Sequence, residues 1–189
     1  MKKFMSIALL SLMTIAAVAQ EAPKKYDIKS GIAKAKTTVM GQAVESTIYF
    51  DNYGTIEANK TKTSVPGAGE IEVSTISKDG KNYVVIPAMK QVQEQPVQDS
   101  INYLNLTDEI KTKYKVMEVG KEIACGKECV KYTAEITQQG QTAKITVWVW
   151  KGFPMKTITA ISGMELVMEV SEFTEDAFIL PQTFEIPEY

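Results

Sequence analysis

The sequence predicts a mainly β protein built as an antiparallel meander. From Tyr26 onward, apolar residues alternate with polar ones at period two, and turn residues interrupt them about every ten positions. One stretch, between Pro96 and Tyr114, has a helical period instead. We therefore expect one sheet of about nine or ten strands, with one or two short helices inserted after residue 96.

Residues 1–19 have the pattern of a cleavable signal peptide. Lys2 and Lys3 precede an apolar run that ends in the small-residue site Ala17-Val18-Ala19. A membrane anchor is the alternative, but the run is shorter than the roughly 20 apolar residues that span a bilayer. We expect cleavage, one domain over residues 20–189 without a membrane span, and a periplasmic or secreted location.

The first half of the mature chain contains two clear strand patterns. Residues 44–50 alternate and run into a turn at 51–54, and residues 71–75 lead into the hairpin turn 78–81. The segment Ala58–Gly69 contains Pro66, Gly67 and Gly69, so we expect it to be a loose connection.

The helical stretch has apolar residues at three- and four-residue steps. Asp99 or Ser100 is the expected cap; alternatively, Asp108 and Glu109 begin a second short turn. The apolar face of this stretch consists of Tyr103, Leu106, Ile110 and Tyr114.

The second half returns to the strand period. Residues 130–136, 143–151, 155–161 and 164–170 alternate and are separated by glycine-containing turns. These segments complete the predicted meander.

Composition excludes several kinds of chemistry. The chain has no histidine and all 21 of its basic residues are lysine, which removes Ser-His-Asp and Cys-His nucleophiles and histidine-ligated zinc. Without residues 1–19 the charge is 19 minus 23, or −4, which argues against nucleic acid as a partner. Late carboxylates such as Glu165 and Glu169 lie on the polar side of a strand, so solvation explains them. We expect no enzyme activity, no cofactor and no metal.

Cys125 and Cys129 flank a predicted three-residue hairpin loop. Such a loop would place them opposite each other, within reach of a disulfide, and an exported protein favours oxidation. A redox or metal site is the less favoured alternative because the spacing is C-x-x-x-C.

Trp148 and Trp150 stand on the polar side of an otherwise alternating strand, so both faces of its end are apolar. The helical stretch, the C-terminal tail or a ligand must cover the indoles, and ordinary core packing is the simplest of these readings. Met164 and Met168 line one face of a later strand, where flexible thioethers suit a core or an apolar pocket.

Five segments, in order, resemble the LolA/LolB-like periplasmic lipoprotein-carrier superfamily and its Bacteroidota branch. The resemblance implies a curved half-barrel whose concave side is apolar, covered by helices, and used by relatives for acyl chains of lipoproteins or lipids. The carrier's long N-terminal helix and its cavity arginine have no counterpart here, so its transfer mechanism is not carried over. The segments are residues 78–87, 114–116, 120–133, 147–156 and 178–181.

Two hypotheses follow for the function. In the first, the chain is an exported non-enzymatic protein that binds a lipid or other apolar ligand in the concave face. In the second, it is a structural or protein-interaction module of the cell envelope, with a filled core and an envelope protein as partner. The residues expected to line the ligand are Trp148, Trp150, Tyr103, Leu106, Ile110, Met164 and Met168.

Overall fold

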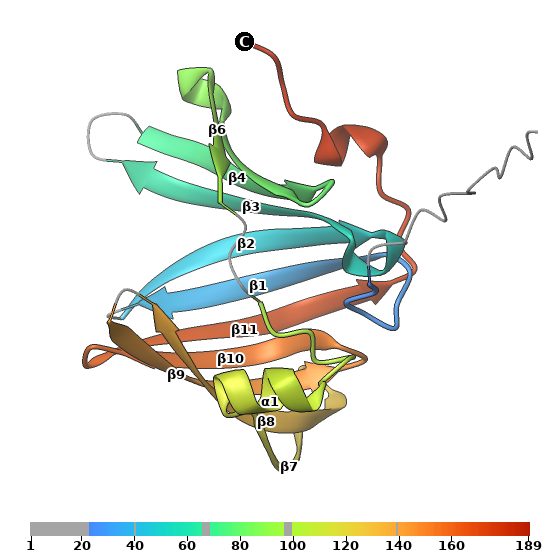
Figure 1. Cartoon of the computed structure of the whole chain (residues 1–189). Coiled ribbons are helices and arrows are strands. Elements are labelled where there is room, and N and C mark those ends of the chain that lie inside the picture. Colours follow the sequence, from blue (N-terminus) through green and yellow to red (C-terminus); the bar gives the residue numbers. More distant parts are fainter. Residues whose placement is uncertain (1–22, 40, 66–68, 97–99, 139) are drawn as a thin grey trace, which may run out of the picture.

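A computed structural model describes residues 23–39, 41–65, 69–96, 100–138 and 140–189 (Figure 1). The predicted signal peptide lies outside these described residues. Among them, no helix combines the length and the apolar character that crossing a membrane requires.

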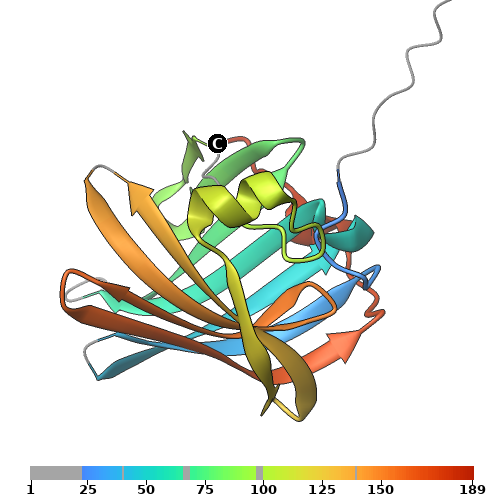
Figure 2. The same ribbon diagram turned by 60° about the horizontal axis from the view of Figure 1, so that its bottom comes forward.

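The described chain forms one antiparallel sheet of eleven strands, so the predicted mainly β meander is confirmed with one strand more than expected. The order is β6-β5-β4-β3-β2-β1-β11-β10-β9-β8-β7, and the sheet curves without closing (Figure 2). The strands are β1 Gly31–Val39, β2 Gln42–Asp51, β3 Ile56–Val65, β4 Gly69–Lys78, β5 Lys81–Ile86, β6 Gln91–Gln95, β7 Met117–Ala124, β8 Lys127–Gln138, β9 Gln141–Trp150, β10 Phe153–Ile161 and β11 Met164–Glu175.

The expectation of a loose connection over Ala58–Gly69 is wrong. Residues up to Val65 belong to β3, which pairs with β2 over residues 56–61 and with β4 over residues 57–65. Ala58 is fully buried, because its position in the register places it beneath a segment from the far end of the chain. Because the sequence of β3 is polar and rich in threonine, its pattern did not predict an internal strand.

One short α-helix, α1 (Asp108–Tyr114), is inserted after β6. Thr107 caps it, since its hydroxyl accepts a hydrogen bond from the Ile110 amide at 3.3 Å. The expected cap at Ser100 is wrong, and Asp99 lies outside the described residues. The alternative start at Asp108 is confirmed. Before the helix, Asn102 accepts a hydrogen bond from the Leu104 amide.

The buried side of the sheet changes from one face to the other at β2. Phe50 packs into the largest apolar cluster, whereas its neighbour Tyr49 packs into a second one. Successive side chains of a strand point to opposite faces, so the apolar contacts of β2 lie on both sides of the sheet. The second cluster is covered by the C-terminal segment, where the 3-10 helix Pro181–Phe184 places Phe184 against Ala58.

Aromatic packing joins the N-terminal segment to the first cluster. The Tyr26 ring lies 4.8 Å from Phe50 and 5.0 Å from Phe153, centroid to centroid. The Asp27 amide donates to the Lys151 carbonyl at 2.9 Å. Gly152 allows this approach: it has φ +83°, and a Cβ there would come within 2.5 Å of the Lys25 carbonyl. Residues 25–28 therefore close one end of the curved sheet.

Three register shifts accompany the curvature of the described strands, one of them between Glu118 and Gly120 in the β7–β8 pair. The β9–β10 register shifts between Pro154 and Lys156, and the β1–β11 register shifts at Lys34/Ala35. A bulge bends its strand and increases the local twist. The curved sheet leaves a concave side, and α1 lies on it (Figure 2).

Replacing Phe50 by alanine is expected to lower the free energy of unfolding by about 3–5 kcal/mol, since the ring is fully buried among aromatic neighbours. Urea denaturation followed by far-UV circular dichroism measures the loss. Phe178→Ala makes the same chemical change at a side chain that is 86% exposed, and should change stability by less than about 0.5 kcal/mol. Equal effects at the two positions would contradict the described core.

Candidate functional site

The concave face is a continuous surface that crosses ten strands. In one row, Ala134, Ile145, Thr159 and Leu166 are partners in successive strand pairs. A parallel row joins Tyr132, Val147, Thr157, Met168, Thr37 and Val44. Apart from the buried Ala134 and Val147, the residues of β8–β11 in these rows are half-buried. They form an apolar strip, with threonines among them, along the concave side of the sheet, and we call this strip the trough.

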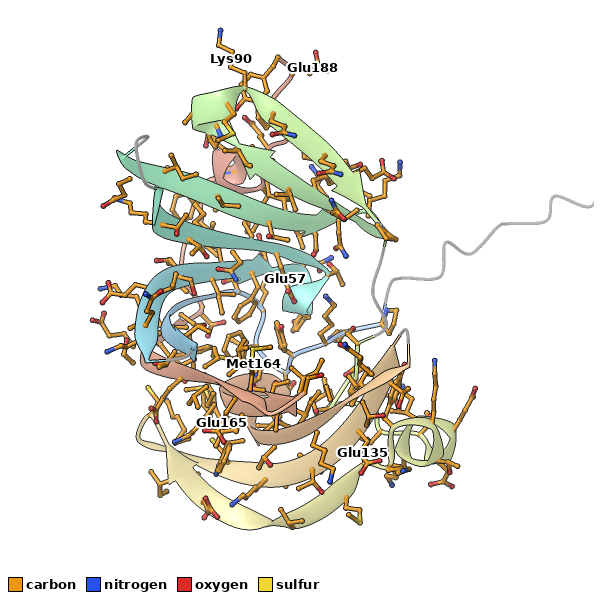
Figure 3. The ribbon with its side chains drawn as sticks, turned by 90° about the vertical axis from the view of Figure 1, so that its left-hand side faces the viewer. Glu57, Lys90, Glu135, Met164, Glu165 and Glu188 are labelled. Atoms are coloured by element: carbon orange, nitrogen blue, oxygen red, sulfur yellow. The ribbon has the colours of Figure 1, made fainter. Side chains whose placement is uncertain are left out.

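Charged side chains are almost absent from this face. In the described strands other than β7, only Glu57, Glu128 and Glu175 share the concave side, and no lysine does. The other charged residues alternate onto the convex face. In β11, for example, the side chains of the neighbours Met164 and Glu165 point to opposite faces of the sheet (Figure 3). That face carries Lys34, Lys36, Glu45, Asp51, Lys60, Lys62, Glu70, Glu72, Lys78, Lys81, Glu94, Lys127, Lys131, Glu135, Lys144, Lys156, Glu165, Glu169 and Glu172.

The three exceptions lie near strand ends and are bonded. Glu57 accepts hydrogen bonds from Lys25 at 3.2 Å and from the Tyr26 hydroxyl at 2.8 Å. Burial, followed by the charge of Glu57, raises the pKa of Tyr26 well above its ordinary value, so this phenol stays neutral. Glu175 is paired with Lys127 and Lys151, and Glu128 with Lys121.

The chain around α1 covers part of the trough. Tyr103, Leu106 and Ile110 are half-buried against Ala134, Ile136 and Ile145 of β8 and β9. The Tyr103 ring lies 5.4 Å from that of Tyr132, and burial with that neighbour raises the pKa of Tyr103 to about 12. These three residues lie over β8 and β9, and their role in lining a ligand stays a prediction.

Trp148 lies apart from that cover. It pairs with Lys131 and Lys156, on the face opposite Val147, and is 7% exposed. Its indole N–H donates to Glu122 Oε2 at 2.7 Å. The ammonium groups of Lys131 and Lys156 lie 4.7 and 5.4 Å from the ring centroid. Lysine side chains thus help to cover this indole, a covering that sequence reasoning did not consider.

Trp150 also packs among protein side chains. Its ring meets Phe173 edge-on at 5.5 Å, and Lys127 and Lys151 lie 4.3 and 4.8 Å from its centroid. Glu175 pairs with both lysines. The structure therefore separates the two tryptophans from the cluster of Tyr103, Leu106 and Ile110.

The two methionines lie on the concave face. Met168 is half-buried against the first cluster, and Met164 is 44% exposed at the end of β11. Leu166 lies between them on the same face, and sequence reasoning did not include it among the lining residues. In the sequence, the alternation of apolar Leu166 with charged Glu165 was the signal that could have identified Leu166 as a lining residue.

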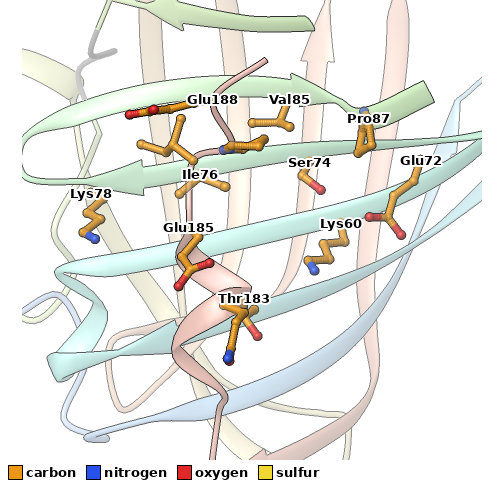
Figure 4. Close-up of a pocket in the computed structure, with 13 residues that line it drawn as sticks. Lys60, Glu72, Ser74, Ile76, Lys78, Val85, Pro87, Thr183, Glu185 and Glu188 are labelled. Atoms are coloured by element: carbon orange, nitrogen blue, oxygen red, sulfur yellow. The ribbon is translucent and has the colours of Figure 1, made fainter. Parts of the chain in front are cut away.

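Two cavities are found on the convex side. One, of about 680 Å³, lies between β3–β5 and the C-terminal segment, and its lining includes Lys60, Ile76 and Glu185 (Figure 4). The other, of about 1070 Å³, has Lys34, Lys36, Lys60, Lys62, Glu45, Glu70, Glu72 and Glu172 among its lining residues. Neither borders α1 or the tryptophans.

Cys125 and Cys129 are free thiols. The expected three-residue loop is wrong: Ala124 pairs with Lys127, so the turn has two residues, and Cys129 stands opposite Glu122 rather than Cys125. Cys125 has φ +49° within that turn. Burial raises the pKa of the Cys129 thiol, which lowers its thiolate fraction and its reactivity. The disulfide itself stays a prediction.

No family model and no curated protein matches the chain. Among solved structures, an uncharacterized conserved protein from Thermus thermophilus has a TM-score of 0.56 and 12% identity, over 85% of this chain and 86% of that one. A chain of the Pseudomonas aeruginosa MucA/MucB complex has a TM-score of 0.53 and 14% identity, over 84% of this chain and 56% of that one. MucB alone has a TM-score of 0.51 and 12% identity, over 84% of this chain and 57% of that one.

This chain therefore spans just over half the length of the MucB chains that it matches. MucB has a LolA/LolB-like fold. The resemblance to that superfamily is thereby confirmed as a likeness of fold.

The Trp148–Glu122 bond is expected to break in acid. Hydrogen bonds from Lys131 and Trp148 lower the pKa of Glu122, so the bond persists above the ordinary carboxyl pKa and is lost as pH falls through the lower folded value. In a Trp150→Phe background, Trp148 emission should shift in that acidic range. Glu122→Gln should remove the shift, and its persistence would contradict this contact.

Iodoacetamide is expected to label Cys125 faster than Cys129 in the reduced folded protein, because Cys129 is fully buried and has the raised pKa. Peptide mass spectrometry measures each site.

Protein taken from an oxidising compartment should resist labelling at both until reductant is added. Labelling of both without reductant would disprove the predicted disulfide.

Proposed function

We propose that this chain is an exported, non-enzymatic protein of the cell envelope that binds a lipid or other apolar molecule in its concave face. The observation that carries the proposal is the trough of half-buried, uncharged side chains next to α1. Burial of apolar ligand surface there would gain about 25 cal/mol per Å². The signal-peptide pattern supports the exported location.

Two further features support a binding role. The trough is closed at one end by residues 25–28 and partly covered by a helix of seven residues. A helix this short depends on tertiary contacts for its stability, and Ile110 and Tyr114 supply them by packing against β8 and β9. Met164 and Met168 supply adaptable apolar side chains near the floor.

The alternative is a protein-interaction module. One observation favours it: the edge strand β7 exposes three large apolar side chains, which are Met117 at 62%, Val119 at 51% and Ile123 at 70%. A free strand edge can pair with an extended peptide. A structure of MucB bound to MucA is among the similar folds, and a protein partner for this chain is proposed on the β7 edge only.

Titration with a pyrene-labelled monoacylglycerol, below its micelle concentration, tests the trough. Leu166→Glu places a carboxylate on the floor and should weaken binding at least about tenfold, since an unpaired charge is costly to cover. Val167→Glu is the matched control, because Val167 is also half-buried but points to the opposite face.

Saturable binding that survives Leu166→Glu but fails with Ile123→Lys would favour the β7 edge over the trough. Circular dichroism melting of each variant separates loss of binding from loss of folding. Absence of saturable binding by the wild-type protein would refute the lipid-binding proposal.

A further inference from the structure

The concave face has two chemically different halves. Over β9–β11 it is apolar with threonines, as described above. Over β3–β5 it carries hydroxyl and amide groups among apolar residues such as Val73 and Val84, and Asn59 and Thr75 stand opposite each other and are exposed. Ser77 and Asn82 form a cross-strand pair whose side chains are hydrogen-bonded at 2.6 Å.

The lysines of α1 and β7 that border the concave face are engaged with other side chains: Lys111 pairs with Asp108, Lys115 with Glu135 and Lys121 with Glu128, and Lys113 lies over the Tyr114 ring. The chain has no arginine or histidine, and in the described strands other than β7 no lysine lies on the concave face. The nearby ammonium groups of Lys25, Lys127 and Lys151 are paired with Glu57 and Glu175. A carboxylate or phosphate over β9–β11 or β3–β5 would therefore meet no lysine from those strands.

The two halves fix the direction of a bound amphiphile. From β9 to β3 there are five strand spacings, or about 24 Å measured along the sheet. With its chain on the apolar half, a ligand places its polar head over β3 and β4. The opposite direction would bring the head under α1, where Tyr103, Leu106 and Ile110 lie.

Resting on the proposed function, we propose that the ligand is an uncharged amphiphile, an acyl chain with a hydroxyl- or amide-bearing head. Its head is hydrogen-bonded by Asn59, Thr75 and their neighbours on β3 and β4. Hydrogen-bonding groups without cations suit neutral donors and acceptors, whereas an anionic head loses hydration without gaining a charged partner.

The test compares a pyrene-labelled monoacylglycerol with the pyrene-labelled fatty acid of the same chain length, at a pH well above the carboxyl pKa. The monoacylglycerol is expected to bind at least about tenfold more tightly. Equal or tighter binding of the fatty acid overturns this inference but leaves the proposed function standing. If neither binds saturably, the proposed function itself fails.

A gain-of-function variant sharpens the comparison. Thr159→Lys places an ammonium group on the concave floor beside Leu166, and should raise fatty-acid affinity several-fold. Ala160→Lys adds the same charge on the opposite face, opposite Glu165, and should leave fatty-acid affinity unchanged. Equal gains in both variants would show non-specific charge attraction and overturn the assignment to this face.

Discussion

The period-two alternation of charge, held in register by antiparallel pairing, is the constraint on which the rest of the structure depends. In the described strands other than β7, the lysines and all glutamates except Glu57, Glu128 and Glu175 lie on one side, and pairing carries that side to the neighbouring strand. A slip of one residue between β1 and β11 would put Lys36 on the concave floor. The uncharged trough is therefore a property of register as much as of composition.

The sheet is long enough to need a different cover on each side. Residues around α1 shelter the concave side of β8 and β9, and the C-terminal segment shelters the convex side of β3 to β5. Phe50 and Tyr49 mark the change between them. Because each cover buries only part of the sheet, the concave floor between β10 and β1 keeps half-buried apolar side chains.

The tryptophans show which features a strand pattern predicts and which it does not. Alternation correctly placed Trp148 on the side of β9 opposite Val147, and correctly required a cover for it. The cover includes Glu122 and the lysines of two neighbouring strands. Long lysine stems can shield an indole while the ammonium group stays in water. Such a cover depends on residues far apart in sequence, so no local pattern could reveal it.

The sequence by itself determined the β class, most of the strands, the uncharged side of each strand and the absence of arginine and histidine, because these depend on local alternation and residue type. Tertiary structure decided that ten such sides join into one concave face, that Ala58 lies in a buried strand, and that the two cysteines are not cross-strand partners. Register, bulges and the docking of chain ends are long-range choices. They are made by packing between segments that the sequence alone does not bring together.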